Sequence, residues 1–148
     1  MKIAIACDHG ALDYKNIIKV ILTEQGYEVV DCGTNNDSSC DYPDFAYKAA
    51  KLVASKEANR AIVLCGTGIG VSIVANKVKG IRCALCNDSL SARLTREHND
   101  SNVLALGQRI IGEELMKDIV NVWLNTDYSD NERHTNRINK IKEIEEKF

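Results

Sequence analysis

The stretch RAIVLCGTGIG, residues 60–70, decides how the chain folds. Its first part, 60–65, is an almost unbroken apolar run of strand length, and a loop with three glycines follows before a helical pattern begins near Gly70. Apolar runs this continuous are typical of strands in a parallel sheet that helices cover on both faces. The stretch therefore predicts a buried strand, a tight loop and a helix in succession.

The same succession of strand, loop and helix also occurs before and after this stretch. Five apolar strand candidates are each followed by a helical pattern, which gives five βα units and an open, doubly wound α/β sheet. Asp88 is placed to cap the fourth helix. The strands are expected at 2–6, 27–31, 60–65, 81–86 and 102–106, and the helices at 13–25, 44–55, 70–77, 88–96 and 112–124.

Size and composition favour one compact domain over residues 1–148, because 148 residues with 45% hydrophobic content supply a substantial core. The 19 basic and 21 acidic residues give a formal charge of -2, so no overall field favours nucleic acid or an anionic membrane. No apolar stretch approaches the roughly 18 residues of a membrane span, and the N-terminal one is too short for a secretory signal. We expect a soluble, cytoplasmic protein.

The six cysteines are expected to be reduced thiols, since most lie in or beside apolar strand segments where free buried cysteines are common. Cys83 and Cys86 form a C-x-x-C motif, but alternation along one strand sends them to opposite faces. The motif therefore does not predict a zinc or redox pair.

Polar residues at the strand ends are the first candidates for a site, because ligands of open α/β sheets bind outside the carboxyl ends of the strands. Asp8 and His9 end the first strand, and Arg109 lies in the loop after the fifth. His98 and Asn99 come just before the fifth strand. A lone histidine is more often structural than catalytic, and Asp8 can equally be a helix cap or a ligand of sugar hydroxyls.

The glycine loop that begins after Cys65 is suited to binding oxyanions through its N–H groups. It follows the third strand, whereas a dinucleotide-binding loop normally follows the first, and no G-x-x-x-x-G-K-[ST] motif is present, so binding of a dinucleotide or nucleoside triphosphate is the weaker interpretation. Cys65 is either an ordinary buried thiol or, beside a helix N-terminus that favours thiolate, a base or nucleophile.

The C-terminal segment 131–148 predicts a charged helix with a narrow apolar stripe at Ile138, Ile141, Ile144 and Phe148. The stripe packs either on its own domain or, as an arm, on a second subunit. Arg133 and Arg137, four residues apart, share one face of this helix and are either solvated or able to grip one phosphate, with His134 as a further donor nearby.

A series of short motifs occurs in order along the chain: Cys7-Asp8-His9-Gly10, Asp31-Cys32-Gly33-Thr34, Asp41-Tyr42-Pro43, Cys65-Gly66-Thr67-Gly68-Ile69-Gly70-Val71-Ser72, Ala75-Asn76-Lys77, Gly80-Ile81-Arg82, His98-Asn99-Asp100-Ser101-Asn102-Val103-Leu104, Gly107-Gln108-Arg109 and Arg133-His134. Together they closely resemble the B-type ribose-5-phosphate isomerases, a family that includes galactose-6-phosphate isomerase subunits. The resemblance covers nearly the whole chain. It implies a Rossmann-like three-layer α/β/α sandwich with a five-stranded parallel sheet, and a homodimer or homotetramer whose active sites are shared between subunits.

The resemblance also implies residue roles in a reaction of the pentose phosphate pathway that needs no metal or cofactor. Cys65 matches the base that moves a proton between two carbons, His98 matches the acid that opens the furanose ring, and Thr67 adds a hydroxyl beside the reacting carbons. Val71 stands where another branch of the family has a glutamate, so this chain is of the cysteine type. The substrate-binding positions are Asp8, His9, Gly66, Thr67, Gly68, Ile69, Gly70, Asn99, Arg109, Arg133 and Arg137.

Three alternatives stay open at the level of sequence. The same chemistry fits allose 6-phosphate or galactose 6-phosphate, because motifs do not report the length of a cavity. A non-catalytic sugar-phosphate sensor would keep the fold and the phosphate grip but would not need both Cys65 and His98. A nucleotide-binding module is the third.

Overall fold

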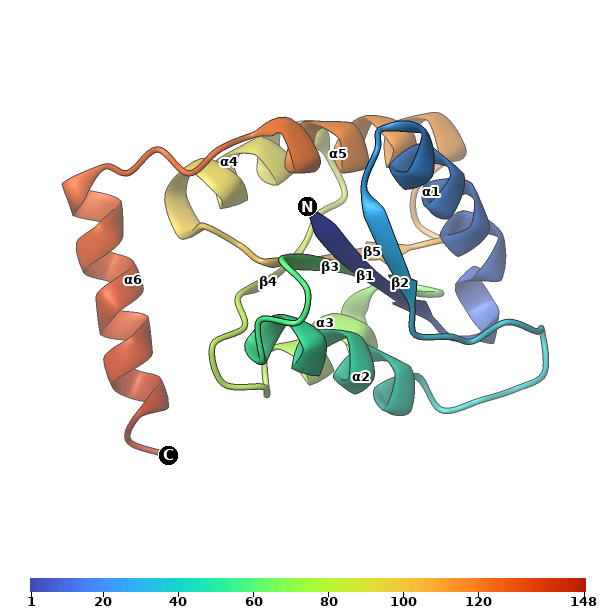
Figure 1. Cartoon of the computed structure of the whole chain (residues 1–148), viewed down its shortest axis with the longest axis horizontal. Coiled ribbons are helices and arrows are strands. Elements are labelled where there is room, and N and C mark those ends of the chain that lie inside the picture. Colours follow the sequence, from blue (N-terminus) through green and yellow to red (C-terminus); the bar gives the residue numbers. More distant parts are fainter.

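A computed structural model describes all of residues 1–148, and it contains the five predicted βα units and a sixth helix (Figure 1). A single 3₁₀ turn, His9–Ala11, precedes the first helix. The strands are β1 (Lys2–Cys7), β2 (Glu28–Asp31), β3 (Arg60–Cys65), β4 (Cys83–Leu85) and β5 (Val103–Gly107), and the helices are α1 (Leu12–Glu24), α2 (Tyr42–Ala54), α3 (Ile69–Ala75), α4 (Ser89–Asn99), α5 (Glu113–Asn125) and α6 (Glu132–Glu145).

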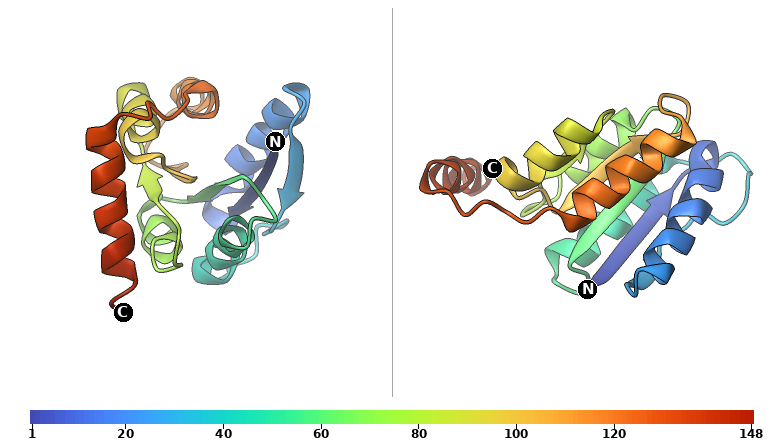
Figure 2. Two further views of the ribbon diagram at one scale, coloured as in Figure 1. Left: turned by 60° about the vertical axis from the view of Figure 1, so that its left-hand side comes forward. Right: turned by 90° about the horizontal axis from the view of Figure 1, so that it is seen from above.

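All neighbouring strands pair in parallel, in the order β2-β1-β3-β5-β4. Helices α1, α4 and α5 cover one face of the sheet, and α2 and α3 cover the other, so the predicted three-layer sandwich is confirmed (Figure 2). The predicted cap is also present, since the Asp88 carboxylate accepts a hydrogen bond from the Ser91 N–H at 2.7 Å. No helix has the length and apolar character that crossing a bilayer requires.

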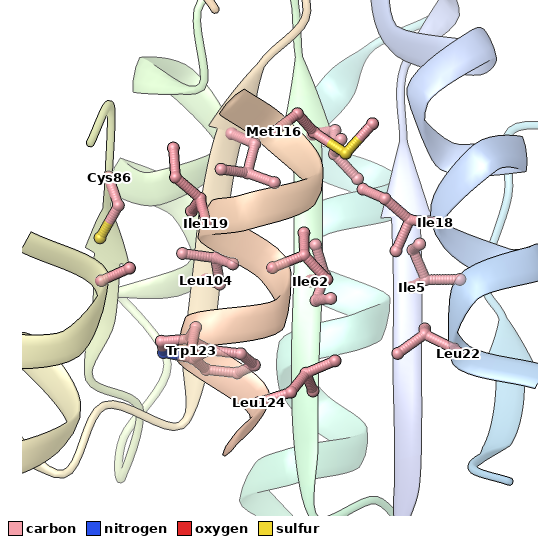
Figure 3. Close-up of a cluster of buried hydrophobic side chains, with 14 of the residues drawn as sticks. Ile5, Ile18, Leu22, Ile62, Cys86, Leu104, Met116, Ile119, Trp123 and Leu124 are labelled. Atoms are coloured by element: carbon pink, nitrogen blue, oxygen red, sulfur yellow. The ribbon is translucent and has the colours of Figure 1, made fainter. Parts of the chain in front are cut away.

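The two faces of the sheet differ in the size of their side chains. Alternation along β1, β3 and β5 sends isoleucines and leucines toward α1, α4 and α5, where they form one cluster with the buried Trp123 (Figure 3). The opposite face presents mainly alanine and valine to α2, whose own buried surface is formed by Ala46, Ala49, Ala50 and Val53. Small side chains on both surfaces allow α2 to lie close to the sheet.

The six cysteines are all free thiols. Cys83 packs against the alanine-rich face and Cys86 belongs to the cluster on the other face, which confirms that the C-x-x-C motif is split by the sheet. Burial raises the pKa of the Cys86 thiol to about 11 and also raises that of Cys83. Because the sheet lies between them, the two thiols do not form a metal-binding or disulfide pair.

A fully buried lysine joins α1 to the segment that follows β2. The Lys15 ammonium contacts both oxygens of Asp31, at 2.8 and 3.0 Å, and also donates to Asn35 Oδ1 at 2.7 Å and to the Thr34 carbonyl. Burial alone would raise the pKa of Asp31, but the hydrogen bonds from Lys15 and Lys19 lower it below its ordinary value. The pair fixes the start of the loop that leads to α2.

Helix α6 lies outside both helical layers, beyond the β4 edge of the sheet (Figures 1 and 2). Of its apolar stripe, Ile138 is buried on the chain itself, whereas Ile144 is 56% exposed and Phe148 is fully exposed. The C-terminal end is attached by polar contacts, since Glu145 accepts from the Gly80 N–H and Glu146 pairs with Lys79. The stripe is therefore only partly covered within one chain.

The Lys15→Met substitution should lower the free energy of unfolding by about 3 kcal/mol, because it leaves the Asp31 carboxylate without its buried partner. Lys19→Met removes the more exposed partner of the same carboxylate and should cost about 0.5 kcal/mol. Urea unfolding followed by the fluorescence of Trp123, at one protein concentration, measures both. Equal losses in the two variants would contradict the assigned role of Lys15.

Candidate active site

Cys65 lies at the carboxyl end of β3, where only 5% of the residue is exposed. Its Sγ accepts a hydrogen bond from the Gly68 N–H at 3.1 Å, which fixes the position of the sulfur beside the loop. Gly68 has a φ of +77°, and a methyl group there would lie 2.8 Å from the Leu106 carbonyl carbon. The position requires glycine, and through it the loop curls back onto the sulfur.

The loops after β1 and β5 meet the glycine loop at this edge of the sheet. A methyl group at Gly10 would lie 3.3 Å from the Gly66 nitrogen, so the two loops are in close contact. The Arg109 N–H donates to the Gly66 carbonyl at 2.9 Å, and the exposed Arg109 side chain lies over Gly66. The structure thus brings the predicted residues Asp8, His9, Cys65 and Arg109 together with the loop.

Asp8 and His9 are each held by a backbone N–H. The Asp8 carboxylate accepts from the Gly10 N–H at 2.8 Å, which makes it a cap as well as a candidate ligand. His9 Nδ1 accepts from the Cys40 N–H at 3.2 Å. Because a backbone N–H can only donate, Nδ1 is unprotonated and the proton of the neutral imidazole lies on Nε2. His9 is therefore oriented as a hydrogen-bond donor.

Thr67 is exposed at the tip of the loop, and its Oγ1 accepts from the Ile69 N–H at 3.2 Å. Its hydroxyl proton has no partner within the chain, which leaves it able to donate outward. Tyr42, at the start of α2, closes the other side, since a methyl group at Gly70 would lie 2.6 Å from the Tyr42 ring. Neither Tyr42 nor Cys40 was expected at the site, because their approach depends on the path of the loop before α2.

His98 and Asn99 belong to α4 itself and not to a loop before β5, because the helix extends to Asn99, beyond the predicted end at 96. The His98 ring stacks on His134 of α6, with centroids 4.3 Å apart and planes 20° apart. Burial, followed by repulsion from His98, lowers the pKa of His134. The cluster thus unites the ends of two helices that are distant in sequence.

Arg133 and Arg137 lie beside this histidine pair on the exposed face of α6. Neither arginine forms an ion pair with a carboxylate, in contrast to Arg82 and Arg96. They line a shallow groove with Lys140 and only one acidic residue, Glu132. The groove is cationic and without apolar side chains, as binding of a dianionic phosphate requires.

The predicted site residues therefore form two groups, one at the carboxyl ends of the strands and the other at their amino ends. Cys65 pairs with Gly107 at the carboxyl ends of β3 and β5, whereas His98 lies five residues before β5 begins at Val103. The length of β5, four residue-to-residue rises, alone separates the two ends by roughly 13 Å. One chain does not bring His98, Asn99, Arg133 and Arg137 to Cys65. No group of three or more His, Cys, Asp or Glu side chains converges to hold a metal ion.

The open α/β sheet with a thiol and a glycine loop at its carboxyl edge can be compared with known proteins. A family model described as Ribose/Galactose Isomerase matches residues 3–141. The ribose-5-phosphate isomerase B of Escherichia coli (strain K12) is 46% identical over 146 residues, covering 99% of this chain and 97% of that protein.

Two solved structures extend the comparison. Ribose-5-phosphate isomerase B of Clostridium thermocellum is 52% identical with a TM-score of 0.97, covering 99% of both chains. That of Mycoplasma genitalium with bound ribulose-5-phosphate is 39% identical with a TM-score of 0.93, covering 99% of this chain and 97% of the other. The fold and these matches define the chain as an isomerase. It belongs to the ribose/galactose isomerase family.

Gly107→Ala should reduce isomerase turnover about 100-fold, because displacement of the loop by 1 Å has effects of that size. The new methyl group would lie 2.4 Å from the Thr67 carbonyl carbon, so the glycine loop must move. Gly112→Ala is the matched control, since nothing lies within 4 Å of that position. Steady-state kinetics of both variants test this, and similar turnover of the two would show that the loop tolerates displacement.

Proposed function

We propose that the whole chain forms one domain that interconverts ribose 5-phosphate and ribulose 5-phosphate. The observation that carries the proposal is the Cys65 thiol, held by the Gly68 N–H at the edge of the sheet where the glycine loop, Asp8 and Arg109 meet. The relative from Escherichia coli and the solved structure with bound ribulose-5-phosphate support this choice of substrate.

In the proposed reaction, the closed furanose is first opened. His98 protonates the ring oxygen while the anomeric hydroxyl loses its proton to water, and cleavage of the bond between C1 and the ring oxygen releases the aldehyde at C1. The Cys65 thiolate then removes the proton from C2, and the N–H groups of residues 66–70 stabilise the negative charge that develops on O1. Transfer of a proton from O2 to O1, together with return of the proton from Cys65 to C1, gives ribulose 5-phosphate. One base suffices because both carbons of a cis-enediolate present the same face.

The loop provides the electrostatic part of this scheme. A preorganised oxyanion donor contributes about 3–4 kcal/mol to stabilisation of a transition state. Thr67, whose hydroxyl has no acceptor within the chain, donates to a substrate oxygen beside the reacting carbons, and Asp8 accepts from the sugar hydroxyls. His9 donates through Nε2, as its bond from the Cys40 N–H requires.

The phosphate is assigned to Arg133 and Arg137, with Arg109 or His9 assisting from the loops beside Cys65, and Asn99 is assigned to substrate binding beside His98. Both α6 arginines are exposed and free of carboxylate partners, so a dianion does not compete with an internal ion pair. They lie with His98 and Asn99 at the amino ends of the strands, away from Cys65, and we call these four residues the His98 group. The ring-opening acid and the phosphate-binding arginines therefore belong to the same part of the chain.

A homodimer follows from this separation. A site that uses both Cys65 and His98 is complete only when a second copy brings its His98 group to the Cys65 loop of the first. The half-covered stripe of α6, with Ile141 40% and Ile144 56% exposed, supplies apolar surface for such a contact. Exposed Ile69 and Ile73 on α3, directly after the glycine loop, supply more.

Cys65→Ala should lower turnover of ribose 5-phosphate by about three orders of magnitude, because it removes the base. Binding of ribulose 5-phosphate, measured by calorimetry, should persist, since the phosphate site is elsewhere. Ketose formation is followed in the presence of a chelator, with allose 6-phosphate assayed in parallel. Cys32→Ala, which removes another buried thiol at a strand end, is the control.

Near-normal turnover of Cys65→Ala would exclude the assigned base. Activity of the unaltered chain on allose 6-phosphate alone would keep the chemistry and change the substrate. Binding of both sugars without turnover would favour a sensor.

Mixing two inactive variants tests the shared site. In a hybrid dimer of Cys65→Ala and His98→Asn chains, one of the two sites combines an intact Cys65 with an intact His98. Random exchange of subunits at equal amounts should therefore restore about a quarter of the normal activity. Each variant alone is the control, and a mixture that stays inactive after verified subunit exchange would show that the two residues do not act across an interface.

A further inference from the structure

The end of α4 is held by an acidic residue between two arginines. Asp100 follows the helix in the left-handed conformation, with a φ of +45°. Its Oδ1 lies 2.8 Å from Arg96 Nη1 and its Oδ2 lies 3.4 Å from Arg82 Nη2. Arg96 is buried, and Arg82 reaches the carboxylate from the segment before β4. We call these three residues the α4 clamp.

The clamp also holds the backbone next to His98. The last carbonyls of a helix lack partners within it, and here the arginines supply them. Arg82 Nε donates to the Asn99 carbonyl at 2.8 Å, and its Nη2 donates to the Asp100 carbonyl at 2.9 Å. Arg96 Nη1 donates to the Ser101 carbonyl at 2.6 Å. Three successive peptide groups after His98 are thus fixed by guanidinium groups.

The same region ties the linker that leads to α6. Arg96 Nε donates to the Thr126 carbonyl at 3.1 Å. The Ser129 hydroxyl and N–H both donate to the Glu97 carbonyl, at 2.6 and 3.2 Å. A few residues later His134 stacks on His98. Arg96 therefore couples the end of α4, which carries His98 and Asn99, to the start of α6, which carries the phosphate arginines.

We propose that Asp100, through its contacts with Arg82 and Arg96, is the positioning residue that aligns His98 for ring opening. The inference rests on the proposed function and deepens it. All its contacts lie beside the His98 group, and none reaches the Cys65 loop at the other edge of the sheet. At saturating sugar phosphate, the clamp thus acts on the ring-opening step and leaves proton transfer by Cys65 unaffected.

The two steps can be measured separately because the two sugars differ in form. Ribose 5-phosphate is a furanose and must be opened before C2 is accessible. Ribulose 5-phosphate has its C5 oxygen esterified, so it cannot close a furanose ring and offers its C1 proton directly. Exchange of that proton for deuterium in D₂O reports formation of the enediolate by Cys65 without any ring opening.

Asp100→Asn is the test variant. Asparagine tolerates the left-handed conformation, so the backbone is retained while the charge that attracts both arginines is removed. The variant should lower kcat for ribose 5-phosphate about 10- to 100-fold, as expected for loss of alignment, while deuterium exchange into ribulose 5-phosphate stays within about twofold of the unaltered enzyme. His98→Asn should show the same pattern and serves as the reference.

Glu113→Gln is the matched control, because it removes an exposed ion pair of the same i,i+4 spacing, with Lys117 on α5, and should change neither rate. Arg82→Lys is the second variant, since lysine keeps the charge but cannot bind both carbonyls at once. Arg82→Lys should show the same separation of rates. It keeps the inference testable if Asp100→Asn melts at a lower temperature than the unaltered enzyme.

Two outcomes would overturn the inference while the unaltered enzyme remains active in both assays. One is an equal fall in both rates for the folded Asp100→Asn and Arg82→Lys variants, which indicates a structural role alone. The other is unchanged turnover of ribose 5-phosphate in both variants. Absence of both reactions in the unaltered enzyme would instead overturn the proposed function.

Discussion

The common direction of the five strands places all their carboxyl ends on one side of the sheet. The first residues of each βα loop therefore converge, and Asp8, Cys65 and Arg109 meet although they are far apart in sequence. The return helices end at the opposite edge for the same reason, and α4 carries His98 there. Parallel pairing thus both assembles one half of the candidate site and keeps the other half away from it.

The loops at the carboxyl ends of the strands approach one another so closely that some of their positions have room only for glycine. Gly107 lies against the Thr67 backbone and Gly70 lies under the Tyr42 ring, where added methyl groups would come within 2.4 and 2.6 Å of their neighbours. The close seat of α2 on the alanine-rich face brings Tyr42 to that position. The packing of one layer therefore determines the shape of the loop around Cys65.

The sequence predicted much of the fold because continuous apolar strands and amphipathic helices leave a strong periodic pattern. Errors lie at element ends, as at β4, which is shorter than expected, and at α4, which is longer. The Cys65 group was predictable because its members follow strands. The stacking of His98 on His134 and the bond from Cys40 to His9 depend on tertiary paths that no local pattern records. The residue roles came from the resemblance and stand as proposals.

The unequal faces of the sheet set different limits on how the sequence can drift. On the face toward α1, α4 and α5, isoleucine and leucine can replace one another with modest repacking. On the other face, Ala46, Ala49 and Ala50 are fully buried against the sheet, so a side chain larger than that of serine forces the layers apart. Alanine can there be exchanged only for glycine or serine. The layer formed by α2 therefore accepts a narrower range of side-chain sizes than the layer on the other face.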